Sequence, residues 1–162
     1  MKKVYIMIAS IVLMFSIKSN AQISKAEIRA TGLTCSMCSN AINKQLKTLP
    51  EVLNIETDLN TNTFTVTLKE GNTINPKVFK EKVEKAGFFI GSLILTVNPE
   101  IIVKEPYVIV NKKEEKQSQV QIQVLDKGYV TEKEFKKLSK SYKDIVTYAN
   151  GNEDDFHIKI VN

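Results

Sequence analysis

Cys35 and Cys38 are the two residues of this chain whose type and spacing are best suited to chemistry. They are the only cysteines among 162 residues, and two residues separate them. Thiolates are soft ligands that suit Cu(I), and also Zn(II) or Hg(II). A disulfide across so short a loop would remove little chain entropy and would add little stability. The pair therefore indicates a site for one soft metal ion, with Cys35 and Cys38 as its ligands.

The residues around the cysteines predict a strand before them and a helix after them. Ala26, Ile28 and Ala30 alternate with charged residues, which is typical of a half-buried strand. From Cys38 onward the apolar residues follow helical spacing, and Pro50 ends the helix. Cys35 then lies on the loop and Cys38 in the first turn of the helix. The N–H groups and the positive dipole end of a helix N-terminus stabilise a thiolate there.

The rest of the first half completes a known order of elements. Two alternating segments joined by a polar turn, residues 53–59 and 64–68, predict a hairpin. Asn75–Pro76 is typical of a helix start and Gly87 of a helix end. A last strand is predicted over residues 88–97. The order β-α-β-β-α-β predicts an α+β, ferredoxin-like domain, with two helices on one face of a four-stranded sheet.

Beyond Asn98–Pro99 the pattern changes, and a small β-rich α+β domain is predicted for residues 99–162. A capping box at Thr131–Glu134 predicts one helix. Strands are predicted around it, within residues 101–110, 120–124, 145–148 and 156–160. Its role is not evident from the sequence.

The N-terminus has the form of a secretory signal peptide. Lys2 and Lys3 precede an uncharged apolar run, and small residues stand on both sides of Asn20. The run is shorter than the roughly 20 residues that span a bilayer. Cleavage after Ala21 is therefore expected, which gives a periplasmic or secreted protein with residues 1–21 as signal peptide, 22–98 as metal-binding domain and 99–162 as the second domain. Only an uncleaved leader would hold the chain at a membrane.

Charge and composition exclude several classes of function. Loss of residues 1–21 removes three lysines and no acid, so the net charge falls from +5 to +2 and nucleic acid is not an expected partner. His157 is the single histidine and is expected to be structural or solvent-facing rather than a ligand. The sequence shows no constellation for hydrolysis or phosphate chemistry, which indicates a protein that is not an enzyme.

The cysteine loop resembles that of the heavy-metal-associated domains. Gly32-x-Thr34-Cys35-x-x-Cys38 matches the family's Gly-Met-Thr-Cys-x-x-Cys except at Leu33, and similar segments are found at Leu49-Pro50-x-Val52 and Ala86-Gly87-Phe88. The resemblance covers about residues 23–97. It implies a ferredoxin-like fold that holds one soft ion on an exposed loop and passes it to a partner by thiolate exchange.

Two departures from the family pattern concern packing rather than ligation. Leu33 replaces a Met that packs inward in the family, and Glu51 stands where a turn glycine is usual. Thr34 is typical of copper-type members. Phe88 is expected to pack over the loop, and Met37 is expected to be exposed or to contact a partner rather than the metal. Exposed lysines could serve either as a docking face for an acidic partner or simply as solvated side chains: Lys44, Lys47 and Lys85.

The sequence thus favours an exported metal-binding protein or metallochaperone for Cu(I). Its expected partner is a metal-transporting ATPase or another metal-acceptor protein of the cell envelope. The alternatives are a periplasmic mercury-binding protein, a thiol–disulfide oxidoreductase and a structural module. Against an oxidoreductase, thioredoxin-like chains place an aromatic residue before the first cysteine, whereas this chain has Thr34 there.

Overall fold

The computed structural model describes residues 23–34, 36–103, 106–111, 118–151 and 155–161. The predicted signal peptide and Cys35 lie outside these residues. The first six elements appear in the predicted β-α-β-β-α-β order, which confirms the α+β, ferredoxin-like arrangement. They are β1 (Ile23–Thr31), α2 (Ser36–Leu46), β2 (Val52–Asp58), β3 (Thr63–Leu68), α3 (Pro76–Lys85) and β4 (Phe89–Val97).

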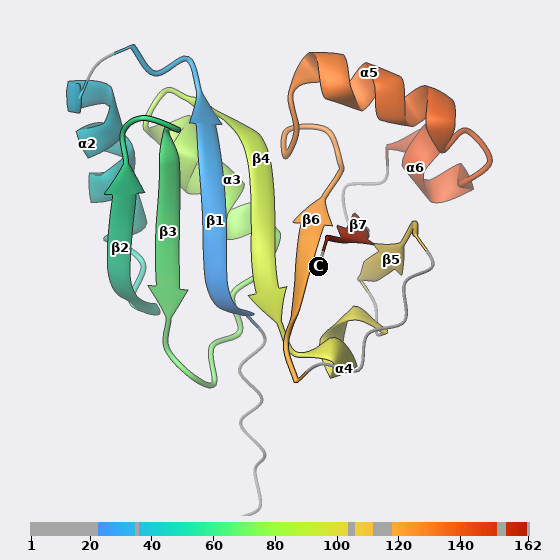
Figure 1. Ribbon diagram of the computed structural model, residues 1–162, viewed down its shortest axis with the longest axis horizontal. Coiled ribbons are helices and arrows are strands. Elements are labelled where there is room, and N and C mark those ends of the chain that lie inside the picture. The colour runs from blue at the N-terminus through green and yellow to red at the C-terminus, as the bar shows by residue number, and fades with distance from the viewer. Residues whose placement is uncertain (1–22, 35, 104–105, 112–117, 152–154, 162) are drawn as a thin grey trace, which may run out of the picture.

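The four N-terminal strands are antiparallel and lie in the order β2-β3-β1-β4. Helices α2 and α3 cover one face of this sheet (Figure 1). Ala26, Ile28 and Ala30 of β1 are buried, as their alternation predicted. Helix α2 buries Ile42 and Leu46 against the same core. The strand that leads into the cysteine loop and the helix that follows it are therefore both fixed by one hydrophobic core.

Helix α3 begins and ends where the sequence predicted. The Asn75 side chain accepts a hydrogen bond from the Lys77 N–H at 3.0 Å, and Pro76 occupies the first turn. Phe79 and Val83 are fully buried. Gly87 has a positive φ of 88°, which a glycine adopts without the steric cost of a Cβ. The chain can then turn sharply into β4 beside the end of β1.

The C-terminal half contains α4 (Pro99–Ile102), β5 (Tyr107–Ile109), β6 (Val120–Val124), α5 (Glu132–Ser141), α6 (Val146–Asn150) and β7 (Phe156–Ile160). The predicted strands at 120–124 and 156–160 and the helix after Thr131 are confirmed. The Thr131 hydroxyl accepts from the Glu134 N–H at 3.3 Å, the first half of the capping box. Most of the charged stretch Asn111–Lys116, for which a solvated turn is predicted, lies outside the described residues.

One strand prediction in this half is wrong, and another is confirmed only in part. Of the described residues within 101–110, Tyr107–Ile109 (β5) form a strand, whereas Asn98 caps the helical turn of α4 by accepting from the Glu100 N–H at 3.1 Å. Residues 145–148 lie at the start of α6 instead of forming a strand. Gly151 ends that helix in the left-handed region, and Tyr148 turns into a small cluster with Leu125 and Val130. Packing of this one aromatic side chain overrides the local β propensity.

The sheet continues across the predicted domain boundary. β4 pairs with β6, β6 with β7, and β7 with β5, so seven strands form one sheet in the order β2-β3-β1-β4-β6-β7-β5. Val120, Ile122 and Ile158 belong to the same hydrophobic cluster as the first half. Asn98–Pro99 thus coincides with the end of β4, while one core extends over both sides of it. The division into two domains stays a prediction, and the shared core favours dependence of residues 99–162 on the first half.

Candidate metal centre

The loop that carries the cysteine motif leaves the end of β1 through Gly32. Gly32 has a φ of 83°, a backbone conformation that side chains with a Cβ rarely adopt. Thr34 is exposed to solvent. The chain therefore turns out of the sheet at Gly32, passes over the end of β1 and re-enters as α2.

Cys38 is the third residue of α2 and is half-buried. Its neighbour Ser39 is buried, whereas Ser36 is exposed. The expected position of Cys38 in the first helical turn is confirmed. Cys35, the other predicted ligand, lies outside the described residues, so it stays a prediction as a ligand. Cys38 therefore lies at the N-terminal end of α2, in the same turn as the exposed Ser36.

Leu33 and Phe88 form an apolar base for this loop. Both are half-buried and pack against the main core. A Cβ added to Gly32 would lie 3.9 Å from the Phe88 Cδ1, which places the ring directly beside the turn. Leu33 thus packs inward, as expected of the residue at the family's Met position. Phe88 has the packing role expected from the sequence.

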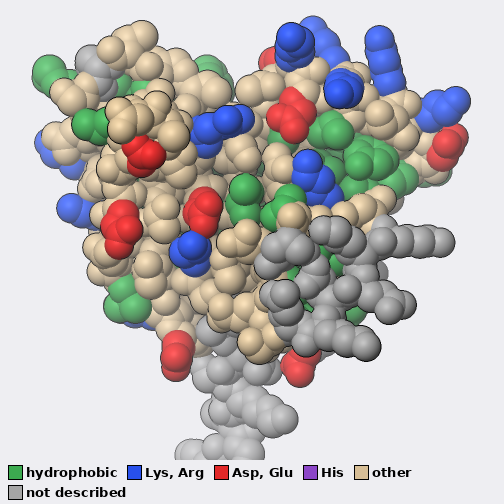
Figure 2. Space-filling view, in the orientation of Figure 1, with side chains coloured by type: hydrophobic (Ala, Val, Ile, Leu, Met, Phe, Trp, Pro, Cys, Tyr) green, Lys and Arg blue, Asp and Glu red, His purple; other side chains and the backbone are tan. Residues whose placement is uncertain are grey.

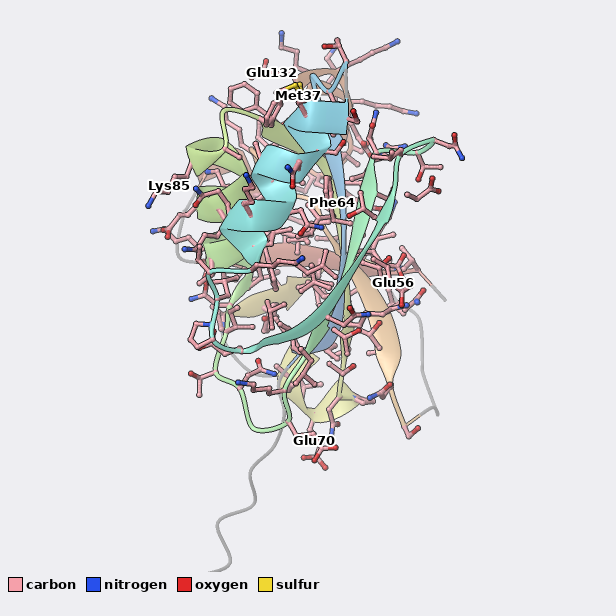
Figure 3. The ribbon with its side chains drawn as sticks, turned by 90° about the vertical axis from the view of Figure 1, so that its left-hand side faces the viewer. Met37, Glu56, Phe64, Glu70, Lys85 and Glu132 are labelled. Carbon is pink, nitrogen blue, oxygen red and sulfur yellow. The ribbon has the colours of Figure 1, made fainter. Side chains whose placement is uncertain are left out.

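Met37 is on the outside of the same turn. Its side chain is 81% exposed, and Figure 3 shows it at the end of the molecule where α2 begins. A small open cavity of about 230 Å³ lies beside it, with Leu33, Thr34, Ser36, Ser39, Leu59 and Asn62 as its lining. The loop is thus reachable from solvent on one side and supported by the core on the other. An incoming ligand has access without a change of fold.

Two hydrogen bonds hold the root of the loop, and the sequence patterns did not single them out. The Ala30 N–H donates to the Asn62 carbonyl at 3.0 Å, which ties β1 to the β2–β3 turn. The Thr31 hydroxyl donates to the Phe89 carbonyl at 3.2 Å. Asn62 itself has a φ of 54°, for which asparagine is one of the few suitable residues. The Asn60-Thr61-Asn62 turn was recognised as polar, but only strand pairing shows that it contacts the loop.

No acidic side chain stands at the end of α2 that carries the cysteine motif, because the first turn of the helix contains no acidic residue. Lys44, Lys47 and Lys85 are all exposed, as a docking face would require. Lys85 points outward from the end of α3 (Figure 3), and lysines are distributed over several parts of the visible surface (Figure 2).

His157 is distant from this site in the sequence and is fully buried in β7. Its ring Nδ1 lies 2.7 Å from the Asp126 Oδ1, and its Nε2 lies 2.8 Å from the Thr147 hydroxyl. Its backbone N–H donates to the other Asp126 oxygen at 2.7 Å. Burial raises the pKa of the Asp126 carboxyl, against hydrogen bonds from His157 that lower it. All polar positions of the ring are occupied, so His157 is structural. Among the described residues, no three His, Cys, Asp or Glu side chains converge on a possible metal position.

Comparison with known families identifies the domain that carries this loop. The model of the heavy-metal-associated domain matches residues 27–89. A copper transporter domain of yeast, Ccc2a, is 35% identical over 40% of this chain and 88% of its own length, with a TM-score of 0.37. The chain belongs to the heavy-metal-associated domain family.

Two other solved structures are similar to this chain to about the same extent. The N-terminal domain of a potential copper-translocating P-type ATPase from Bacillus subtilis is 32% identical over 41% of this chain and 81% of its own, with a TM-score of 0.37. A chain of the Atx1–Cu(I)–Ccc2a complex is 35% identical over 40% and 88%, with a TM-score of 0.36. No curated protein sequence matches. In the described part of the chain, no helix has the length and apolarity to cross a membrane.

Proposed function

We propose that this protein is an exported metallochaperone that binds one Cu(I) ion between Cys35 and Cys38 and transfers it by thiolate exchange. The observation that carries the proposal is the position of Cys38 in the first turn of α2, within a domain of the heavy-metal-associated family. The exposed Thr34 and Ser36 leave that turn accessible to a partner.

The chemistry follows from the two thiolates. Cu(I) is a soft ion that accepts a small number of thiolate ligands. Two thiolates and Cu(I) have a net charge of −1, which the positive end of α2 offsets in part. Transfer needs an incoming thiolate to add before an outgoing one leaves, and the solvent-exposed side of the loop gives it room. Each copper–sulfur bond that forms with the partner replaces one to this protein, and the oxidation state of copper does not change, so the protein acts as a carrier rather than as an enzyme.

The choice of Cu(I) over Hg(II) and Zn(II) rests on Thr34 and on the relatives. Thr34 precedes the first cysteine, as in copper-type members of the family. The Ccc2a and Bacillus subtilis domains, both more than 30% identical to this chain, are described as copper domains. Zn(II) prefers four ligands, two more than the Cys35–Cys38 motif itself supplies.

The proposed partner is a metal-transporting ATPase or another metal-acceptor protein of the cell envelope. The complex between Atx1 and Ccc2a contains Cu(I), and one of its chains is similar to residues of this one. Export is proposed from the signal-peptide pattern of residues 1–21. Mass measurement of the protein recovered from the envelope tests it, because cleavage gives a chain that begins at Gln22.

Competition with a chromogenic Cu(I) chelator tests the metal site. The whole reduced protein is expected to bind one Cu(I), and Cys35→Ser and Cys38→Ser should each lose nearly all affinity, because one thiolate cannot chelate. Met37→Leu, a change of similar volume between the two cysteines, is the matched control and should retain it. Full affinity in Cys35→Ser would refute the site, and loss in Met37→Leu would make the thioether a ligand. The affinity for Cu(I) should also weaken as the pH is lowered, because protons compete with the metal for the thiolates.

A further inference from the structure

Helix α5 presents two sides of opposite character, and one of them is basic. An α-helix turns by about 100° per residue, so the four lysines of α5 fall within an arc of about 100°. These residues, which together form the lysine face, are Lys133, Lys136, Lys137 and Lys140. All four are exposed, and Figure 2 shows Lys and Arg side chains gathered over α5. The solvent side of this helix is therefore a row of positive charges.

The opposite side of α5 is held by the protein itself. Phe135 and Leu138 are half-buried and pack against the small cluster that contains the buried Tyr148. Glu132, Phe135 and Ser139 line a cavity of about 930 Å³, whereas none of the four lysines does. The lysine face therefore points away from the rest of the chain.

The acidic residues of α5 leave most of this charge without a partner. Glu132 lies 3.8 Å from the Lys136 Nζ, but the two side chains are 77% and 76% exposed, so the pair is weak. Glu134 is half-buried and falls outside the arc of the lysines. Lys143 and Asp144, beyond the end of the helix, add one charge of each sign. The other three lysines form no ion pair within the described residues.

The shape and chemistry of the lysine face favour a lipid surface over a protein partner. Protein interfaces concentrate their affinity in pockets that exclude water, and these lysines line neither the larger cavity nor the smaller one of about 230 Å³. Lysine is a flexible, hydrated point charge, whereas fixed bidentate pairing with a carboxylate is a property of arginine, which α5 lacks. Lipid headgroups move laterally to meet such charges, so they need no pocket. An amphipathic helix with a lysine-rich polar face is typical of proteins that bind membrane surfaces.

We infer that the lysine face of α5 binds anionic phospholipid headgroups and holds the protein reversibly at a membrane surface. Clusters of roughly four to eight basic residues on an amphipathic helix attract anionic lipids. Because the apolar side of α5 packs against the protein, the contact is electrostatic and does not enter the hydrocarbon core. The inference goes beyond the proposed function, since the contact uses neither cysteine. It would keep the chain at a membrane after loss of the leader, which the pattern of residues 1–21 does not predict.

Co-sedimentation with vesicles tests the inference. It uses the chain from Gln22 onward, which contains every described residue and lacks the apolar run of the leader. The protein should bind vesicles of equal parts phosphatidylglycerol and phosphatidylcholine, and should not bind phosphatidylcholine alone. Added salt should release it, because salt screens interactions between exposed charges. Equal binding to both kinds of vesicle, or binding that salt does not weaken, would overturn the inference.

Two matched double variants locate the contact. Lys137→Gln/Lys140→Gln removes two charges from the lysine face and retains the helix, because glutamine and lysine have similar helix propensities. It should weaken vesicle binding by at least about tenfold, since each lysine near an anionic surface contributes a factor of about five. Lys44→Gln/Lys47→Gln removes the same charge on and just after α2, which lies on the other flank of the molecule (Figure 1), and should leave binding within about twofold. Equal loss in both variants would show a general attraction of a cationic protein and would overturn the assignment to α5.

Polyglutamate distinguishes a lipid surface from an acidic protein. At equal concentrations of anionic groups, the vesicles should bind the protein more tightly than polyglutamate does, because mobile headgroups can gather under all the lysines at once. Tighter binding of polyglutamate would overturn the lipid assignment and indicate an acidic protein as the partner.

Cu(I) binding by the same variants keeps the two proposals distinct. Lys137→Gln/Lys140→Gln retains both cysteines and should bind Cu(I) normally, whereas Cys35→Ser/Cys38→Ser should bind vesicles normally. If the unaltered protein binds vesicles but not Cu(I), only the proposed function is refuted. If it binds Cu(I) but no anionic vesicle, only the role of the lysine face is refuted.

Discussion

Leu33 shows how one residue of the metal loop acts through packing rather than through ligation. It is half-buried against the core, next to the Phe88 ring, and its neighbours Gly32 and Thr34 face solvent. A residue in this position determines how firmly the loop rests on the sheet.

Leu33→Met should therefore leave Cu(I) affinity within a few fold. A swap of these two side chains conserves volume and costs less than about 1.5 kcal/mol in a core. Chelator competition measures the affinity, and Leu46→Met in the same core but remote from the loop is the control. A large gain in affinity confined to Leu33→Met would mean that this position supplies a thioether ligand.

Asp126 is the residue on which the buried His157 depends. It accepts from both the backbone N–H and the ring of His157 at 2.7 Å. Asp126→Ala leaves these two buried polar groups without their partner, and each such group costs about 1–3 kcal/mol.

Urea denaturation should show this loss for Asp126→Ala and almost none for Asp144→Ala, because Asp144 is exposed. Cu(I) affinity should not change in either variant. A stability equal to that of the unaltered protein would mean that water replaces the carboxylate.

At the scale of elements, β5 is the least supported strand of the sheet. It has three residues, it lies at the edge, and it pairs in parallel with β7. Its principal anchor is Tyr107, whose ring packs on Phe156 with centroids 5.8 Å apart. Burial raises the pKa of Tyr107 from 10.0 to about 12.

The raised pKa predicts a loss of stability in alkali. Below pH 10 the phenol is neutral in both the folded and the unfolded chain. Between pH 10 and about 12 only the unfolded chain ionises, so the free energy of unfolding should fall as pH rises through this window. Denaturation curves at a series of pH values measure the fall. Tyr107→Phe should reduce its steepness, while the buried Tyr129 and Tyr148, whose pKa values burial also raises, keep part of it.

For the whole molecule, the continuous sheet has the greatest consequences. In the first half β4 would form an open edge, and here β6 covers it through five residue pairs from Leu93–Val124 to Val97–Val120. The C-terminal strands in turn bury their apolar residues against the core of the first half. The first half therefore needs β6 only to cover the edge of its sheet, whereas the C-terminal half needs the first half to bury its apolar residues.

Cutting the chain between Asn98 and Pro99 tests this dependence. Residues 22–98 contain the whole matched domain and its own part of the core, so they should fold and bind Cu(I), but melt at a lower temperature and associate through the exposed β4 edge. Residues 99–162 should be unfolded alone, because about 60 residues without their packing partner bury too little surface. Circular dichroism of each piece and of their mixture measures the outcome. A folded, cooperatively melting C-terminal piece would show two independent modules.

The sequence by itself determined the first half of the fold and the position of the site. Alternation in β1, the Asn75–Pro76 start and the Gly87 end act over a few residues, and the core they imply has a single arrangement with two helices on one face. The cysteine motif was recognisable for the same reason, because its ligands, its turn glycine and its helix start are adjacent in the chain. Cys38 lies where that pattern placed it.

Only the tertiary structure decided the role of the C-terminal half. Its strand β6 pairs with β4 rather than forming a sheet of its own, and Tyr148 draws residues 146–150 into a helix where local propensity favoured a strand. One cavity is lined by both Lys77 and Lys127, which are 50 positions apart, and by both Thr31 and Phe135, which are 104 positions apart. No periodicity in the sequence encodes such pairs, because they depend on which edge of the sheet the later strands cover.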